Sequence, residues 1–212
     1  MIKNKYLYLN DKKFFDQGYE FIGGLDEVGR GSWAGPLVVG LVIFDKKYKN
    51  PEINDSKQIS KKKREILYKA IVNNAIYYAT KFIDADEIDK VDNIKTSVHN
   101  AMVDLIADAK KFSEALYLVD AEKIVIDNRH IETEIKGDEK YQAIAAASII
   151  AKVEHDSYMQ KLAPSYPMYH FDKNVGYGVS QHKKAIERYG IINHLHRKTF
   201  EPMKSIIKNK KK

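Results

Sequence analysis

Short apolar runs mark the strands that this chain is expected to form. Residues 21–26 and 37–44 flank a glycine-rich turn, a pattern that predicts a β-hairpin. Residues 76–83 are rich in tyrosine and β-branched side chains, and residues 115–119 form a compact apolar run, so we predict a strand in each. The run at 124–126 is too short to assign.

Four other segments repeat apolar residues with helical spacing. Ser60 is a suitable N-cap for a helix that extends to about residue 74, and helices are also predicted over about 93–111, 141–162 and 180–189. The third of these is rich in alanine, which lets a helix pack closely against a sheet. Strands come first and helices then alternate with strands, so the sequence predicts an α/β fold with a mixed sheet flanked by helices.

Positive charge is concentrated near the C-terminal end. Residues 161–212 contain 12 Lys or Arg and 3 Asp or Glu, whereas the preceding 160 residues contain 24 and 26. This asymmetry predicts a basic lobe beside a mildly acidic body. The alternative is a lysine-rich composition with a disordered KNKKK tail. Without Lys208, Lys210, Lys211 and Lys212, however, the segment still holds 8 basic and 3 acidic residues.

The composition also excludes several kinds of chemistry. The chain has no cysteine, so disulfides, thiolate ligands and cysteine nucleophiles are absent and any metal must be held by oxygen or imidazole. The N-terminal residues lack an apolar run long enough for a signal peptide. The longest apolar stretch, 37–44, is far shorter than the roughly 20 residues of a membrane span. We therefore expect a cytoplasmic protein without membrane contact, with a monomer as the default.

Acidic residues follow or precede several of the predicted elements. Asp26 and Glu27 end an apolar strand just before a Gly-Arg-Gly turn. Neighbouring strand residues face opposite sides, so these two share a site only where the strand is ending. Asp120 also ends a strand, and Asp138 lies just before the alanine-rich helix. Each has a simpler explanation as a surface pair, a turn residue or a helix-capping acid.

A cluster of such acids would suit phosphodiester hydrolysis. Two divalent ions about 3.5–4 Å apart activate water, stabilise the leaving oxygen and clamp the phosphate, and Mg²⁺ prefers carboxylate ligands. No nucleophile elbow supports a serine triad, and no HExxH zinc motif is present. Asp156 lies 18 residues beyond Asp138, about 27 Å of rise in an unbroken helix, so one metal cluster does not include both.

A series of motifs then makes the pattern specific. In order along the chain these are LDEVGRG, AGPLVVG, DSKQISKKKRE, YLVDA, IKGD, AAASIIAKV, YPMYHFDKNVGYG and LHRKTF. Together they resemble ribonuclease HII, the type 2 ribonucleases H, from about residue 20 to about residue 203. The resemblance implies a ribonuclease H-like fold: a five-stranded mixed sheet with helices and a C-terminal helical extension. We expect a catalytic core over 1–163, a basic helical region of the same domain over 164–212, and a disordered tail over 208–212.

The resemblance also implies an activity. Members of this family hydrolyse the RNA strand of RNA–DNA hybrids with Mg²⁺ or Mn²⁺, and incise on the 5′ side of a ribonucleotide embedded in duplex DNA, leaving 3′-hydroxyl and 5′-phosphate ends. By motif position the catalytic and metal-binding acids are Asp26, Glu27, Asp120 and Asp138. Asp127 is a rival for the third place because it also follows a short apolar run, but LVDA matches the family motif directly. Asp156 matches a recurrent family position and is expected to support the site rather than react.

Contacts to the nucleic acid follow from the same motifs. Gly29, Arg30 and Gly31 resemble the family's junction-sensing turn, and glycines let the backbone approach the 2′-hydroxyl that separates RNA from DNA. Tyr177, flanked by glycines, resembles the tyrosine that stacks on the sugar beside the ribonucleotide.

Three basic residues are expected to contact phosphates: Lys57, Arg197 and Lys198. His196 is compatible with a general acid, a phosphate ligand or a packing residue, and the sequence does not choose among them. The chain departs from the family pattern at Ser32-Trp33, where Pro-Leu is usual, and at Glu154-His155, where Thr-Arg is commoner. Two alternatives remain: a nuclease of the same fold that ignores the ribose, and a non-catalytic nucleic-acid-binding module.

Overall fold

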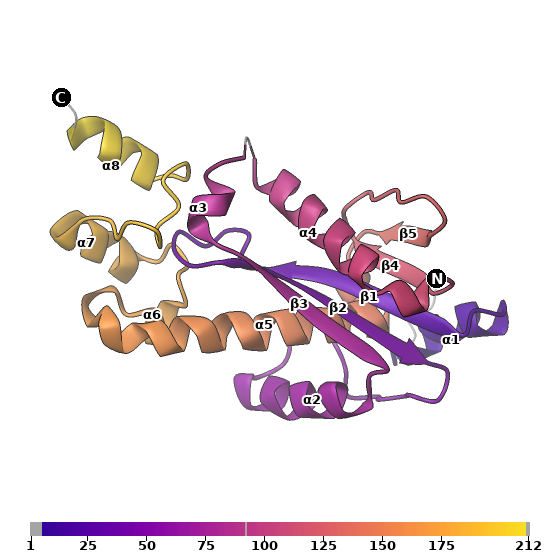
Figure 1. Ribbon diagram of the computed structural model, residues 1–212. Helices are drawn as coiled ribbons and strands as arrows, with labels where there is room; N and C mark the ends of the chain where they lie inside the picture. The colour runs from indigo at the N-terminus through magenta and orange to yellow at the C-terminus, as the bar shows by residue number, and fades with distance from the viewer. Residues whose placement is uncertain (1–5, 92, 211–212) are drawn as a thin grey trace. The chain divides into compact units, whose positions relative to one another are not determined.

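The computed structural model describes residues 6–91 and 93–210 (Figure 1). Its strands are β1 (Phe21–Val28), β2 (Leu37–Asp45), β3 (Tyr77–Ile83), β4 (Leu116–Asp120) and β5 (His130–Glu134). Its helices are α1 (Tyr8–Asp16), α2 (Lys61–Asn74), α3 (Ala85–Ile88), α4 (Ile94–Asp108), α5 (Gln142–Leu162), α6 (Phe171–Asn174), α7 (Ser180–Tyr189) and α8 (Met203–Lys210). Short 3₁₀ turns occupy Lys110–Phe112, Gly137–Glu139, Ala163–Ser165 and Pro167–Tyr169.

The strands form one mixed sheet in the order β3-β2-β1-β4-β5. β1, β4 and β5 are parallel neighbours, and Leu25 of β1 is in register with Val119 of β4. The predicted mixed five-stranded sheet with flanking helices is therefore confirmed. No helix among residues 6–91 and 93–210 is long and apolar enough to cross a membrane.

The chain divides into two compact units. The first contains residues 1–27, 39–81 and 99–153, and the second contains 28–38, 82–98 and 154–212. In the first unit, α2 and the beginning of α5 lie on one side of the sheet and α4 lies on the other (Figure 1). The sequence predicted a single boundary after residue 163, between a catalytic core and a basic helical region. These two units are each built from several segments and do not test that boundary, which stays a prediction.

Some elements with weak amphipathic patterns were not predicted from the sequence. β5 reads His-Ile-Glu-Thr-Glu with one apolar residue, because it is an edge strand and most of its side chains are exposed or half-buried. Residues 124–126, considered as a strand, are irregular. The short helices α1 and α8 were not predicted either. Residues 208–210 of the expected tail lie in α8, and residues 211–212 lie outside the described residues.

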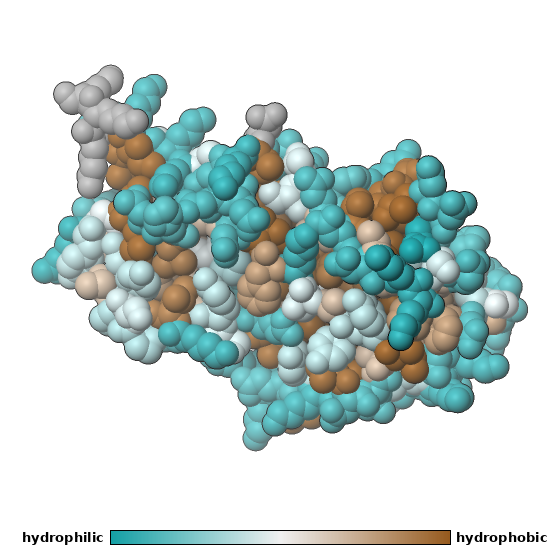
Figure 2. All heavy atoms as spheres, in the orientation of Figure 1, coloured by the Kyte–Doolittle hydropathy of each residue, from teal (hydrophilic) through white to brown (hydrophobic). Residues whose placement is uncertain are grey.

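Helix α5 packs directly on the backbone of the sheet. A Cβ added to Gly24 of β1 would lie 2.0 Å from the carbonyl carbon of Ala143, and one added to Gly40 of β2 would lie 2.7 Å from the oxygen of Ala147. The close approach predicted for the alanine-rich helix is therefore confirmed, with glycines as its counterpart on the strands. Hydrophilic side chains cover most of the visible surface and hydrophobic ones form scattered patches (Figure 2).

The N-terminal end of α5 is capped by a side chain from another helix. The Asp11 carboxylate of α1 accepts hydrogen bonds from the backbone N–H groups of Gln142, at 2.9 Å, and Ala143, at 3.0 Å. Burial raises the pKa of Asp11 to about 7 although both N–H donors act to lower it. This contact ties α1 to the point where α5 begins.

Asp11→Ala tests this cap. The substitution leaves two buried N–H groups of α5 without their acceptor, so we expect the free energy of unfolding to fall by about 1–3 kcal/mol in urea titrations followed by circular dichroism. Asp16→Ala on the same helix is the matched control, because Asp16 is exposed and forms only an i,i+4 ion pair with Lys12. Equal losses in the two variants would contradict the capping role.

Candidate active site

Three predicted acids lie where parallel strands end. Leu25 pairs with Val119, so Asp26 and Asp120, each one residue further along, follow the same level of β1 and β4. Glu27 follows at once, and its backbone N–H donates to Asp26 Oδ1 at 2.8 Å. The carboxyl ends of neighbouring parallel strands meet at one edge of a sheet. The strand ends therefore bring these acids together although they are far apart in the sequence.

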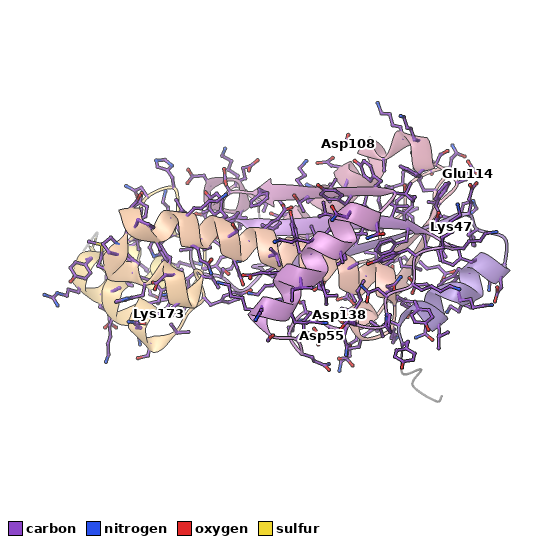
Figure 3. The ribbon with its side chains drawn as sticks, turned by 90° about the horizontal axis from the view of Figure 1, so that it is seen from below. Lys47, Asp55, Asp108, Glu114, Asp138 and Lys173 are labelled. Atoms are coloured by element: carbon purple, nitrogen blue, oxygen red, sulfur yellow. The ribbon has the colours of Figure 1, made fainter. Side chains whose placement is uncertain are left out.

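The fourth acid reaches the same edge through a 3₁₀ turn. Asp138 is buried in the turn Gly137–Glu139, which leads into α5 (Figure 3). The backbone N–H of Gly137 donates to Asp120 Oδ1 at 2.6 Å and so ties the turn to the end of β4. A Cβ at this glycine would lie 2.3 Å from Cδ1 of Ile144, so the turn needs glycine to come this close.

The four acids interact electrostatically. Burial raises the pKa of Asp26 well above its ordinary value, and the charges of Glu27, Asp120 and Asp138 raise it further. Burial likewise raises the pKa of Asp120, where the charge of Asp138 adds to the effect and the N–H of Gly137 opposes it. The site therefore concentrates negative charge in a region poorly reached by water.

One lysine partly balances this charge. Lys57 Nζ lies 3.2 Å from Asp138 Oδ2. Burial lowers the pKa of Lys57, but the charges of Asp138 and Asp26 outweigh it and the net change is upward. The Lys57 side chain is 78% exposed, so its ammonium group is accessible to other anions. Its predicted phosphate contact stays a prediction.

Two serines also belong to this cluster. Ser148 of α5 forms a side-chain hydrogen bond with Asp26 that acts to lower the pKa of that carboxyl. Ser148 Oγ lies 2.9 Å from Ser56 Oγ, and both serines are buried. Neither serine was predicted as part of the site, although the single serine within the apolar run AIAAASIIA was a signal for Ser148.

The donor set fits hard divalent cations. Its four acids offer carboxylate oxygens, which Mg²⁺ and Mn²⁺ prefer. Besides burial, the charges of neighbouring acids raise the pKa values of Asp26 and Asp120. Among residues 6–91 and 93–210, no three His, Asp or Glu side chains stand close enough to hold an ion in their present positions. The fit therefore lies in the chemistry of the acids and in the edge of the sheet that they share.

The remaining acids lie elsewhere. Asp127 is exposed in the loop between β4 and β5, and the charges that raise the pKa of Asp26 come from Glu27, Asp120 and Asp138. These observations favour Asp120 over its rival. In the second unit, Asp156 Oδ1 lies 3.0 Å from His155 Nδ1, so this carboxylate orients the imidazole.

The glycine turn predicted to sense the ribose lies in the second unit. Gly29 has a φ of +88°, and a Cβ there would lie 2.8 Å from the oxygen of Pro36 and 2.9 Å from His155 Nε2. No other residue fits this conformation without strain. Gly31 is exposed and Arg30 is half-buried, so the turn presents backbone to solvent.

The Tyr177 loop is bonded to the segment that follows this turn. The carbonyl of Gly176 accepts hydrogen bonds from Trp33 N at 2.8 Å and Ala34 N at 3.2 Å. A Cβ at Gly178 would lie 2.1 Å from the Trp33 ring. The unusual Trp33 is therefore accommodated by a glycine of the loop that carries Tyr177.

The guanidinium of Arg197 forms its hydrogen bonds inside the protein. Arg197 is fully buried, and its guanidinium donates to the carbonyls of Gly35, from Nε at 3.2 Å and Nη2 at 3.1 Å, and of Arg30, from Nη1 at 3.1 Å. Burial lowers the pKa of Arg197 to about 10, which still leaves it protonated at pH 7. These hydrogen bonds to the protein backbone give no support to the phosphate contact predicted for Arg197, which stays a prediction.

Lys198 is better placed for a phosphate contact. Its backbone N–H donates to Asp89 Oδ2 at 2.8 Å, which fixes the main chain of this segment. Its ammonium lies 3.7 Å from Asp86 Oδ1 and its side chain is 38% exposed. The contact predicted from the sequence therefore stays a prediction.

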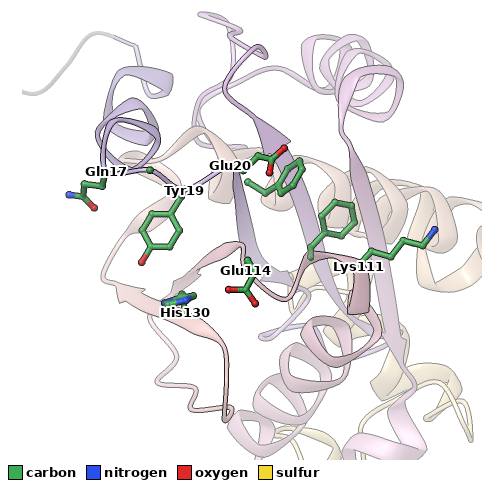
Figure 4. A pocket seen from close by; sticks show the side chains of 9 residues that line it. Gln17, Tyr19, Glu20, Lys111, Glu114 and His130 are labelled. Carbon is green, nitrogen blue, oxygen red and sulfur yellow. The ribbon is translucent and has the colours of Figure 1, made fainter.

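A pocket of about 770 Å³ lies in the first unit, and none of the four candidate metal-binding acids lines it. It is lined by residues that precede or begin β1, β4 and β5, among them Tyr19, Glu114 and His130 (Figure 4). The acids follow the opposite ends of β1 and β4. This pocket is therefore not part of the candidate active site.

Comparisons with known proteins give the family and the fold. The family model described as Ribonuclease HII matches residues 23–203. The chain is 44% identical over 194 residues to the ribonuclease HII of Bacillus cytotoxicus, covering 92% of this chain and 73% of that protein. It is 41% identical over 202 residues to the ribonuclease HII of Endomicrobium trichonymphae, covering 95% of each.

Solved structures agree. Ribonuclease H2 from Pyrococcus horikoshii is 27% identical with a TM-score of 0.68, covering 91% of this chain and 99% of that one. Bst-RNase HIII in complex with Mn²⁺ is 19% identical with a TM-score of 0.70, covering 91% and 70%, and it bears on the fold alone. The fold is thus the ribonuclease H-like fold expected from the motifs. With a family model matching most of its length and relatives above 40% identity, the chain belongs to the ribonuclease HII family.

Proposed function

We propose that this chain is a metal-dependent endonuclease that hydrolyses the RNA strand of RNA–DNA hybrids and incises duplex DNA 5′ of an embedded ribonucleotide, leaving 3′-hydroxyl and 5′-phosphate ends. Its family membership supports the reaction class. The observation that carries the proposal is the placement of the four acids at one edge of the sheet: Asp26 and Asp120 follow the paired residues of parallel strands, Glu27 is next to Asp26, and the Gly137 N–H ties the turn of Asp138 to Asp120 at 2.6 Å.

Asp26, Glu27, Asp120 and Asp138 would hold two divalent cations, Mg²⁺ or Mn²⁺. When bound, such ions activate a water molecule and stabilise the leaving oxygen of the phosphodiester. The carboxylate ligands support the choice of these ions. Bst-RNase HIII, whose likeness to this chain bears on the fold, is known in complex with Mn²⁺. The buried hydroxyl of Ser148 orients Asp26, and the Gly137 N–H fixes the direction of Asp120.

Contacts to the substrate come from groups with exposed donors. Lys57 and Lys198 keep accessible ammonium groups and would bind backbone phosphates, which makes affinity dependent on salt. The turn Gly29-Arg30-Gly31 would place backbone groups against the ribose 2′-hydroxyl, and Tyr177 would stack on the adjacent sugar. The left-handed conformation of Gly29 and the glycines beside Tyr177 support these roles.

Asp120→Asn tests the metal assignment. Asparagine keeps an oxygen that accepts from Gly137 N–H but removes the charge, so we expect cleavage of a duplex with one embedded ribonucleotide to fall by orders of magnitude in Mg²⁺ or Mn²⁺. Binding of the duplex should survive. Asp127→Asn is the matched control, because Asp127 lies exposed in the following loop. Loss of activity in the control with full activity in Asp120→Asn would reverse the assignment.

The same assay tests the substrate. An all-DNA duplex of identical sequence should remain intact under conditions that cleave the duplex with one ribonucleotide. Equal cutting of both duplexes would indicate a nuclease that ignores the ribose. Binding without cleavage of either duplex, or of a long RNA–DNA hybrid, would indicate a non-catalytic nucleic-acid-binding module.

Tyr177→Ala tests the stacking role. Loss of an aromatic platform costs about 1–3 kcal/mol, or about 5- to 150-fold, in recognition of the stacked group. We expect kcat/KM for an embedded ribonucleotide to fall by this factor, and more than kcat/KM for a long hybrid. Tyr189→Ala, which truncates an exposed tyrosine of α7, should change neither. If Tyr177→Ala leaves both substrates unaffected, the stacking role is wrong.

A further inference from the structure

Two buried histidines in the second unit have no part in the chemistry proposed above. His182 of α7 and His196 both have no exposed surface, and their Nε2 atoms lie 3.1 Å apart. The other ring nitrogen of His182 lies 3.0 Å from the carbonyl oxygen of Tyr177. The other ring nitrogen of His196 accepts a hydrogen bond from Ile192 N–H at 2.9 Å.

The partners of this pair fix where its protons lie. Ile192 offers only a donor, so His196 Nδ1 is unprotonated and neutral His196 carries its proton on Nε2. The Tyr177 oxygen is only an acceptor, so His182 carries its proton on Nδ1 and accepts at Nε2. The hydrogen bonds therefore run in one direction, from Ile192 through His196 and His182 to Tyr177.

The surroundings keep both imidazoles neutral. The rings of Tyr169 and Phe171 contact both histidines, and Trp33 contacts His182. Burial lowers the pKa of His196 to about 4, with a further contribution from His182. Burial also lowers the pKa of His182, although the Tyr177 carbonyl opposes this. The titratable group that faces both rings is the Tyr169 phenol, which donates to the Gly190 carbonyl.

The hydrogen bonds of the pair end on the backbone of Tyr177. The Tyr177 N–H donates to the carbonyl of Asn174, and its carbonyl accepts from Val179 N–H as well as from His182. At the other end, His196 directly precedes Arg197, whose guanidinium holds the Arg30 carbonyl. The pair thus connects the loop of Tyr177 with the segment that braces the glycine turn.

We propose that His182 and His196 are positioning residues, a neutral pair of fixed tautomers that sets the orientation of Tyr177 and thereby the discrimination of a ribonucleotide junction. This inference rests on the stacking role proposed for Tyr177. It also decides among the three roles open for His196. A residue without exposed surface and with both ring nitrogens bonded inside the protein is neither a phosphate ligand nor a general acid.

The tautomers are measured directly by ¹⁵N NMR of the imidazole rings in the full chain without substrate. We expect His182 protonated on Nδ1, His196 protonated on Nε2, and a scalar coupling between the two Nε2 atoms across their hydrogen bond. The opposite tautomers, or rings that exchange freely between tautomers, would overturn the proposal. This NMR measurement does not depend on activity, so its result is independent of whether Tyr177 has the proposed stacking role.

A pair of His182 variants tests the functional link. His182→Asn keeps an N–H donor near the position of Nδ1, whereas His182→Leu keeps bulk without a donor. We expect His182→Leu to lower kcat/KM at an embedded ribonucleotide by about the factor found for Tyr177→Ala, and His182→Asn to retain most of the activity. In a Tyr177→Ala background, His182→Leu should have no further effect, because coupled residues are not additive.

Three outcomes are distinguishable. An equal loss from His182→Leu with and without Tyr177 would show that the histidine acts elsewhere and would overturn the proposal. An unchanged rate in Tyr177→Ala would instead remove the proposed stacking role, whatever the tautomers. If circular dichroism shows that His182→Leu does not fold, the proposal is still tested by the ring tautomers of the unmodified chain and by the activity of His182→Asn.

The lowered pKa values of the two histidines should make the free energy of unfolding depend on pH. Because the pKa values of both histidines are lowered in the folded chain, the unfolded chain binds more protons below its ordinary histidine pKa of about 6.5. Above this pH the pair should contribute no pH dependence to the urea midpoint of unfolding. As the pH drops from about 6.5 towards 4, we expect the midpoint to fall. The fall should be smaller in His196→Gln. Parallel pH profiles for the two proteins would contradict a neutral buried pair.

Discussion

Mutual repulsion among four acids at one edge of the sheet is the constraint on which this structure depends. Burial raises the pKa values of Asp26 and Asp120, and the charges of neighbouring acids raise them further. Such a cluster persists only if the backbone holds it, and α5 provides this support. The helix rests directly on Gly24 and Gly40, and its beginning is capped by Asp11 and adjoins the turn that carries Asp138. The divalent cations proposed for this site would relieve the repulsion.

In the second unit, hydrogen bonds to backbone carbonyls and close backbone contacts hold the segments that carry the proposed recognition groups. The guanidinium of Arg197 donates hydrogen bonds to the carbonyls of Arg30 and Gly35. The Tyr177 loop is held by Gly176 on one side and by the histidine pair on the other. The stacking role proposed for Tyr177 would need such precise placement, since a small displacement of the ring would remove much of the proposed discrimination.

Much of the fold and the acidic cluster could be predicted from the sequence. Strong apolar runs gave four of the strands, and the acids stood out because each lies at the end of such a run or just before the alanine-rich helix. β5 was missed because an edge strand needs few apolar residues, and α1 because its only strong signals, Asp11 and Phe14, contact distant segments. The roles of Ser148, Arg197 and His196 depend on partners far away in the chain. Residue type alone therefore suggested a phosphate contact for Arg197, whereas its burial and its hydrogen bonds to backbone carbonyls could be seen only in the structure.

Metal binding is the most direct test of the central claim that four acids converge on divalent cations. Mn²⁺ binding followed by electron paramagnetic resonance, in the absence of nucleic acid, should show specific sites in the unmodified chain and in Asp127→Asn. The sites should be lost or strongly weakened in Asp26→Asn, which removes the charge at the centre of the cluster. Equal Mn²⁺ affinity in Asp26→Asn and the unmodified chain would contradict the account.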